Sequence, residues 1–193
     1  MREKALVKLI LKGDSSAGEM FVDTYYPPVY RLLLHLCRNR DIAEDLAQQT
    51  FAAAWKGLTE FRFGSSIGTW LHQIARREYM HWLRDIKPTL PIHLMCETTN
   101  SEQGHSTNRM LIYDALAQLS EDQRLCFLLV YVQQLTVKEA SLVLEIPVGT
   151  VKSRLFAARE KLKLFITEDL ENKAEQPKQK DLVNVEGVTN ETC

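Results

Sequence analysis

Apolar residues recur at helical spacing along most of this chain of 193 residues. Downstream of Asp41 they fall on one face of an α-helix, at Ala47, Phe51, Ala54, Trp55 and Leu58. Similar stripes run through 70–84, 111–119, 127–131 and 155–165. No stretch of any length alternates between apolar and polar residues as a half-buried strand would. The pattern therefore predicts an all-α protein.

Local signals indicate where these helices begin and end. A capping box pairs a short oxygen-bearing side chain with an acid or amide three residues later. Such pairs are Asp41 with Glu44, Ser120 with Gln123, and Thr136 with Glu139, and we expect a helix to begin at each. Prolines are typical of boundaries. We therefore expect breaks between helices at Pro27, Pro28, Pro88, Pro91 and Pro147.

The chain divides into four segments. Residues 1–87 and 108–166 carry the helical stripes, and 88–107 holds two prolines and many small polar residues, as a flexible linker does. After residue 166 the chain becomes polar and acidic, which predicts a disordered tail over 167–193. The sequence thus predicts two small helical domains joined by a flexible linker.

Composition excludes several classes of protein. With 25% charged and 45% hydrophobic residues, the chain is typical of globular proteins rather than of a collagen, a low-complexity chain or a disulfide scaffold. No apolar run approaches the length of about 18 residues that a membrane span needs. The N-terminus lacks the long apolar core of a signal peptide, so we expect no membrane insertion.

Residues that could support catalysis or bind a metal are scattered. Four cysteines (37, 96, 126 and 193) lie far apart, and the five histidines form no set at metal-ligand spacing. The chain has no phosphate-binding glycine loop, nucleophile elbow or HExxH motif. We therefore expect no catalytic residues, no metal and no cofactor, and reduced thiols in a cytosolic protein that is not an enzyme.

The net charge of −1 hides an uneven distribution. Residues 148–164 contain five basic residues and one acidic residue, whereas 168–193 contain seven acidic and three basic residues. An acidic tail therefore masks a local basic patch. The overall isoelectric point is a poor guide to what this chain binds.

The basic patch belongs to a predicted helix-turn-helix in the C-terminal domain. A short capped helix over 136–144 precedes a tight break at 144–147 and a basic helix that opens at Val148. A basic second helix after a short turn suits the major groove of DNA. The first turn of this helix, with its free N–H groups and the Thr150 hydroxyl, suits a phosphate.

Further along this helix the side chains suit DNA contacts of two kinds. Lys152, Ser153 and Phe156 can meet base edges and thymine methyl groups. Three longer side chains can reach phosphates: Arg154, Arg159 and Lys161. The alternative interpretation is the solvated face of an ordinary amphipathic helix.

Segment 61–87 interleaves aromatic and basic side chains around a loop at 64–68 that contains two glycines. Aromatic rings stack on unpaired bases while basic side chains hold the backbone, so the mixture suits single-stranded nucleic acid. The aromatic residues are Phe61, Phe63, Trp70, Tyr79 and Trp82, and the basic residues are Arg62, Arg76, Arg77, Arg84 and Lys87. A hydrophobic core is the alternative role for these rings.

Acidic side chains cluster on the helix expected after residue 41. Glu44, Asp45 and Gln48 lie one to four positions apart beside the apolar stripe. No histidine or third ligand is nearby in the sequence, which favours a protein-docking face over acid–base catalysis or a metal site. A plain solvated face remains the alternative.

Together these motifs resemble bacterial sigma factors of the sigma-70 family, in the two-domain extracytoplasmic function (ECF) group. The likeness covers nearly all of 5–165. It rests on Tyr25-Tyr26-Pro27, on the pattern from Asp41 to Trp55, on Thr69-Trp70-Leu71 with Ile74-Ala75-Arg76, and on Ile146 to Leu155 with Ala158-Arg159. Arg77, His81, Glu145 and Ala157 depart from residues that are common in the family, which bears on the promoter sequence rather than on the role.

The resemblance implies that 1–87 is sigma region 2 and 108–166 is sigma region 4. Region 2 would bind the clamp helices of the largest subunit of core RNA polymerase through Asp41, Glu44, Asp45, Leu46, Gln48, Phe51 and Trp55. It would capture and help to melt the −10 element through Arg62, Phe63, Ser65, Trp70, Arg76, Arg77 and Arg84. Region 4 would read the −35 element through Thr136, Thr150, Lys152, Ser153, Arg154, Phe156 and Arg159.

The resemblance also implies the biological setting. The protein would be an alternative sigma factor that directs promoter-specific transcription initiation, in the cytoplasm and on the nucleoid when in holoenzyme. Its partners would be core RNA polymerase, promoter DNA and an anti-sigma factor. Two other functions stay open at this point: a helix-turn-helix regulator that does not bind core polymerase, and a protein-interaction or decoy module.

Overall fold

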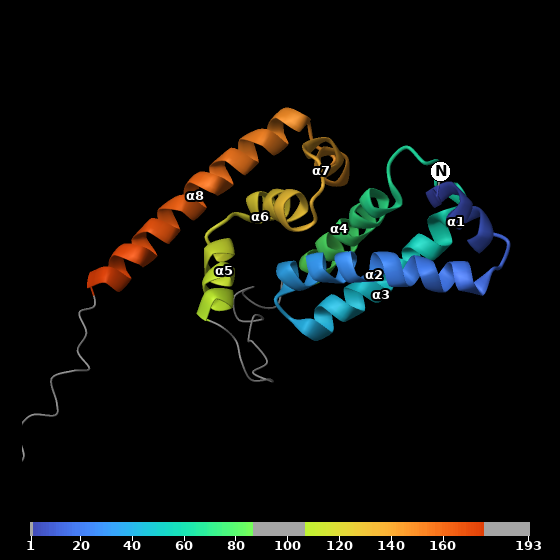
Figure 1. Cartoon of the computed structure of the whole chain (residues 1–193), viewed down its shortest axis with the longest axis horizontal. Coiled ribbons are helices and arrows are strands. Elements are labelled where there is room, and N and C mark those ends of the chain that lie inside the picture. The colour runs from blue at the N-terminus through green and yellow to red at the C-terminus, as the bar shows by residue number, and fades with distance from the viewer. Residues whose placement is uncertain (1, 87–106, 176–193) are drawn as a thin grey trace, which may run out of the picture.

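Helices build both halves of the chain. A computed structural model describes residues 2–86 and 107–175, and within these ranges it contains helices and no strand (Figure 1). The all-α prediction is thus confirmed for the described part of the chain. The N-terminal domain comprises α1 (Arg2–Ile10), α2 (Ser15–Cys37), α3 (Arg40–Gly57), the 3-10 turn η1 (Leu58–Glu60) and α4 (Ile67–Ile86).

The C-terminal domain continues the same architecture. It comprises α5 (Thr107–Ala117), α6 (Glu121–Phe127), the one-turn π-helix η3 (Leu128–Val132), α7 (Val137–Leu144) and α8 (Val148–Glu175). Helix α8 therefore runs beyond residue 167, where the composition predicts the start of a disordered tail. The rest of that tail, and all but the last residue of the linker expected over 88–107, lie outside the described residues, and Thr107 begins α5.

Two of the three expected capping boxes are present. Ser120 and Gln123 cap α6, and Thr136 and Glu139 cap α7, each through reciprocal bonds between side chain and backbone. The third capping box, expected at Asp41 and Glu44, is wrong. Asn39 caps α3 instead, since its side chain accepts from the backbone N–H of Ile42 at 3.1 Å. Helix α2 ends at Cys37, and Arg38, which follows it, has a left-handed conformation, so the chain turns before Asp41 and the next helix begins at Arg40.

The expected break at Pro27 and Pro28 is also wrong, since both prolines lie inside α2. Proline lacks a backbone N–H and disfavours the helix interior. Tertiary packing offsets that cost here, because Val29, Leu32 and Leu33 directly after the prolines are at most 1% exposed. Packing of α2 against α3 and α4 therefore overrides the local signal.

An aromatic cluster holds the first half of α2 against α3. The fully buried Phe21 ring lies 5.8 Å from the Phe51 ring and 5.7 Å from the Trp55 ring, both edge-on. Tyr26 stacks on Tyr30 and also contacts Phe51. This packing fixes the orientation of α3 and hence the direction of its polar face.

The two domains pack against each other through α4 and α7, and through α2 and η3 (Figure 1). Buried side chains of both domains form one continuous hydrophobic cluster. Between the domains, the Arg124 guanidinium donates to the Tyr79 hydroxyl at 3.4 Å, and the Arg38 guanidinium donates to the Tyr113 carbonyl. The two domains are therefore in direct contact, an arrangement that we call closed.

No helix in the described part of the chain is both long enough and apolar enough to cross a membrane. Cys37 and Cys126 are buried in the helical core, whereas Cys96 and Cys193 fall outside the described residues.

The Phe21 contacts lead to a stability prediction. Phe21→Ala removes a fully buried ring, so we expect the free energy of unfolding to fall by about 3–5 kcal/mol. Met20→Ala, at a neighbouring side chain that is 60% exposed, is the matched control and should change it by less than about 0.5 kcal/mol. Urea titration of both variants measures the difference, and equal midpoints would contradict the packing described.

Candidate nucleic-acid interface

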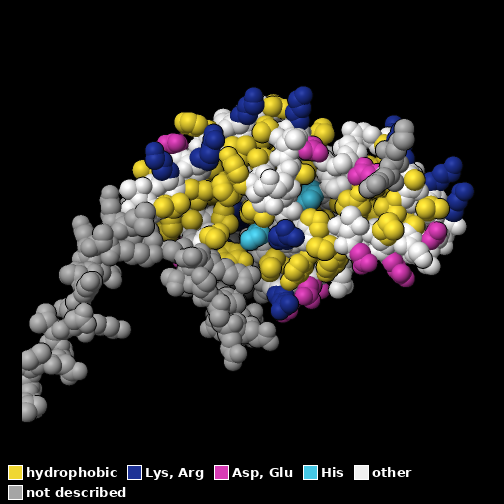
Figure 2. All heavy atoms as spheres, viewed as in Figure 1, with side chains coloured by type: hydrophobic (Ala, Val, Ile, Leu, Met, Phe, Trp, Pro, Cys, Tyr) yellow, Lys and Arg dark blue, Asp and Glu magenta, His cyan; other side chains and the backbone are white. Residues whose placement is uncertain are grey.

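Helix α8 presents its polar side outward from the helix-turn-helix. Val151, Leu155 and Ala158 are buried beneath it. On the opposite side, Lys152, Ser153, Phe156 and Arg159 are exposed, and the Phe156 ring is 61% exposed. Figure 2 shows Lys and Arg side chains spaced along the outer edge of this helix. The structure thus brings these residues, predicted to contact the −35 element, onto one accessible face.

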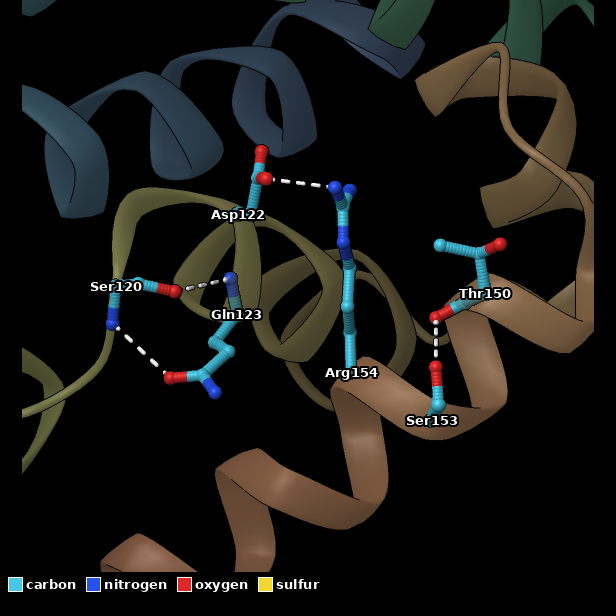
Figure 3. Close-up of polar contacts among 6 residues, drawn as sticks. All are labelled: Ser120, Asp122, Gln123, Thr150, Ser153 and Arg154. Atoms are coloured by element: carbon cyan, nitrogen blue, oxygen red, sulfur yellow. Dashed lines mark hydrogen bonds and ion pairs between the residues drawn. The ribbon is translucent and has the colours of Figure 1, made fainter.

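Arg154 is held differently from its neighbours. Its guanidinium pairs with the Asp122 carboxylate of α6 at 2.6 Å, and its side chain is only 28% exposed (Figure 3). The pair fixes α8 against α6 within the C-terminal domain. In this arrangement Arg154 orients the helix that carries Lys152 and Phe156, and its own charge is largely engaged.

Two of the hydroxyl groups predicted to contact DNA already have partners. The Ser153 hydroxyl donates to the Thr150 carbonyl at 3.0 Å (Figure 3). The Thr136 backbone N–H and hydroxyl both donate to the Glu139 carboxylate, at 2.8 and 2.7 Å. These two hydrogen bonds from Thr136 hold the pKa of Glu139 below its ordinary value of 4.5. Thr136 therefore fixes the start of α7.

The loop before α4 gathers the aromatic residues predicted to contact the −10 element. The Phe61 ring lies 4.7 Å from both the Phe63 ring and the Trp70 ring, and it stacks on Trp70. Phe63 has a left-handed backbone, with φ of 58°, and the Lys4 ammonium lies 5.4 Å from the centre of its ring. All three rings are half-buried, so each combines core packing with some exposed surface.

Helix α1 braces the start of α4. One oxygen of the Glu3 carboxylate accepts from the Ile67 backbone N–H and from the Tyr25 hydroxyl, each at 3.2 Å. A carboxylate at a helix N-terminus also complements the helix dipole. Burial, with the nearby Glu3 charge, raises the pKa of Tyr25 to about 12. No signal in the sequence pointed to Glu3.

Three arginines predicted to contact the −10 element meet in one groove. The groove has a volume of about 390 Å³ and lies between α4 and α6. Its lining comprises Arg76, Arg77, Met80, His81, Leu83, Arg84, Glu121 and Asp122. Arg77, His81 and Arg84 are exposed, which leaves the guanidinium groups of the two arginines accessible to an anion. Arg62 is exposed and Ser65 is half-buried in the preceding loop.

Helix α3 carries the acidic face expected to bind a protein. Asp41, Glu44, Asp45 and Gln48 are exposed, and Trp55 continues the same face with 47% of its surface exposed. The other two predicted contacts lie deeper: Leu46 is buried and Phe51 is half-buried in the aromatic cluster. These two side chains lie beneath the exposed face of α3.

His72 lies buried in α4 where the two domains meet. Burial lowers its pKa below the ordinary value of 6.5, while the Gly68 carbonyl, 2.6 Å from Nδ1, and the Gln133 side chain act in the opposite direction. The folded protein therefore favours the neutral imidazole. Helical periodicity predicts that His72 and His81 face opposite ways, because nine residues correspond to about 180° around a helix, and the structure has His72 buried and His81 exposed.

Comparisons with known proteins match both domains. The family model described as "Sigma-70 region 2" matches residues 21–89, and "Sigma-70, region 4" matches residues 109–162. The chain is 29% identical over 182 residues to the ECF RNA polymerase sigma factor SigW of Bacillus subtilis, covering 84% of this chain and 96% of that protein. It is 28% identical over 176 residues to the ECF RNA polymerase sigma-E factor of Escherichia coli K12, covering 83% and 92%.

Solved structures are similar over most of the chain. The sigma factor RpoE, in complex with the anti-sigma factor NepR from Bartonella quintana, matches with a TM-score of 0.66 and 25% identity, over 77% of this chain and 96% of that chain. CnrH, in complex with the cytosolic domain of CnrY, matches in fold with a TM-score of 0.68 and 20% identity, over 86% and 98%.

The position of His72 leads to a pH prediction. The unfolded chain takes up a proton at His72 more readily than the folded chain, so stability should fall as the pH drops below about 6.5. The slope contributed by one such group is at most about 1.4 kcal/mol per pH unit. His72→Asn should flatten this dependence, and His81→Asn, at an exposed residue, should not. Urea unfolding between pH 7.5 and 5.5 measures it, and a wild-type slope in His72→Asn would refute it.

Proposed function

Because the chain belongs to the sigma-70 family and acts as an ECF sigma factor in transcription initiation, we propose how its described surfaces divide that task. The protein is a regulatory subunit that supplies binding and positioning. It acts in the cytoplasm, on the nucleoid when in holoenzyme. Its proposed contacts lie on three helices, α3, α4 and α8, each with its own chemistry.

Helix α3 binds core RNA polymerase. Its exposed acids Asp41, Glu44 and Asp45 form a negative stripe that ends at the half-exposed Trp55. An acidic stripe with an aromatic anchor fits the clamp helices of the largest subunit if these present basic and apolar side chains. This stripe carries the proposal, because a regulator that acts on DNA alone has no need of it.

Helix α4 and the loop before it capture the unpaired −10 strand. The partly exposed rings of Phe63 and Trp70 offer stacking to bases, and the exposed Arg77 and Arg84 of α4 offer positive charge to phosphates. Stacking on the extruded bases offsets the cost of separating the strands. The N-terminal domain thereby both melts and reads the element.

Helix α8 reads the −35 duplex in the major groove. The exposed Lys152 and Arg159 contact phosphates or base edges, and the exposed Phe156 meets apolar groups such as thymine methyls. Arg154 acts by orienting the helix through Asp122. Two weak readers joined in one chain gain affinity through their effective concentration.

An anti-sigma factor is the proposed regulator. A solved structure of similar fold holds the sigma factor RpoE in complex with the anti-sigma factor NepR. An inhibitor of this kind would act by covering α3, α4 or α8.

The polymerase contact is tested by charge reversal on α3. We expect Asp45→Arg to weaken binding to core RNA polymerase at least about tenfold, because it places a cation in the negative stripe. Glu60→Arg makes the same charge change at an exposed residue of η1, outside the stripe, and is the matched control. Fluorescence anisotropy of the labelled protein titrated with core enzyme measures both. Wild-type affinity in Asp45→Arg would refute this role of α3.

The DNA contact is tested on α8. Lys152→Ala should weaken duplex binding and reduce the slope of log affinity against log salt by about one. Lys163→Ala removes an exposed lysine three turns further along the same helix and serves as the control. The measurement is a salt series of anisotropy titrations with promoter duplex. If the two variants lose affinity equally, the first turns of α8 are not the reader.

A further inference from the structure

The C-terminal domain rests on the helix proposed to read the −10 strand. Thr69 and Gln73 lie one turn apart on α4 and both face α7. The Thr69 hydroxyl donates to the Glu139 carboxylate at 3.4 Å, and the Gln73 amide donates to the Leu142 carbonyl at 2.9 Å. These contacts join two segments of the chain that are far apart in sequence.

One turn further along α4, Arg76 continues this stripe. Its Nη1 lies 3.6 Å from Glu145 Oε2, with the two side chains 23% and 62% exposed. The Nε atom of Arg76 is buried and has no hydrogen-bond partner among the described residues. A carboxylate offers a guanidinium the same paired oxygens that a DNA phosphate does. While Arg76 is paired with Glu145, it is less able to pair with DNA.

Glu145 occupies an unusual backbone position. It ends α7 with φ of 57° and ψ of 38°, a left-handed conformation that glycine adopts freely and glutamate does not. A residue other than glycine kept in such a conformation points to a use for its side chain. The carbonyl end of α7 adds negative partial charge beside the same arginine.

We propose that Glu145 and the end of α7 form a latch on Arg76 that adds to the packing between the two domains and withholds Arg76 from DNA in the free protein. The inference rests on the proposed function of α4 and α8. Elements at −35 and −10 are about 25 base pairs apart, or about 85 Å along B-DNA. Helices α4 and α7 are in direct contact, so the domains must separate before one promoter can be read at both elements.

The latch is weak enough to open on binding. An exposed ion pair shifts an equilibrium by about two- to fivefold. It therefore biases the free protein toward the closed arrangement without preventing its conversion to the open one. A partner that binds only the open arrangement shifts the population toward it, by an amount set by the difference between the partner's affinities for the open and closed arrangements.

Substitutions at Glu145 test the latch in the full chain. Glu145→Gln removes the charge of the side chain. Glu145→Gly also removes it and places at this left-handed position a residue that adopts the conformation without strain, so we expect this variant to fold. Asp114→Asn neutralises an exposed acid on α5 of the same domain and is the matched control. The two readouts are the radius of gyration from small-angle X-ray scattering and anisotropy with a labelled 20-nucleotide single-stranded DNA at low salt.

We expect both Glu145 variants to expand and to bind the single strand about two- to fivefold more tightly, with Asp114→Asn unchanged. An unchanged radius of gyration in both Glu145 variants, or an equal gain in Asp114→Asn, would overturn the latch. A third result separates the latch from the proposed function. If the Glu145 variants expand but neither they nor the wild type bind the single strand, the proposed role of α4 is wrong and the contact between the domains is still supported.

Discussion

Helix α4 is the element on which the rest of the structure depends, because it packs against helices of both domains. Leu71, Ile74 and Ala75 are buried on its apolar side, and full burial of a side chain such as Leu or Ile contributes about 1.5–3 kcal/mol. Its polar side meets α7 through Gln73 and Arg76. With both sides in contact, the helix has a defined geometry in the closed arrangement, and the DNA contacts proposed for its α7-facing side require the domains to separate.

Most of the fold could be predicted because its signals are local. The helical stripes and the capping boxes at Ser120 and Thr136 depend on residues a few positions apart, and the structure has them. The failures have two causes. At Pro27 and Pro28 a local preference competes with the packing of α2 against α3, and packing wins. At Asp41 a second local signal wins, because Asn39 is also a favourable N-cap residue and caps α3 two residues earlier.

The candidate site was predictable by region and less so by residue. Exposure of Lys152 and Phe156 follows from the period of α8, because the buried positions of that helix are apolar. The partners of two arginines do not follow, since Asp122 and Glu145 lie on other elements and are brought near only by tertiary contacts. Periodicity says which face of a helix is polar, and it does not say which other helix that face will meet.

The brace between α1 and α4 extends the functional unit beyond the segment that the family model matches, which begins at residue 21. Glu3 ties the first helix to the N–H of Ile67 and to the hydroxyl of Tyr25. Anything that pulls α1 away also frees the first turn of α4, the helix proposed to read the −10 strand. An affinity tag fused ahead of Arg2 would therefore act directly on this brace, and purification should be designed accordingly.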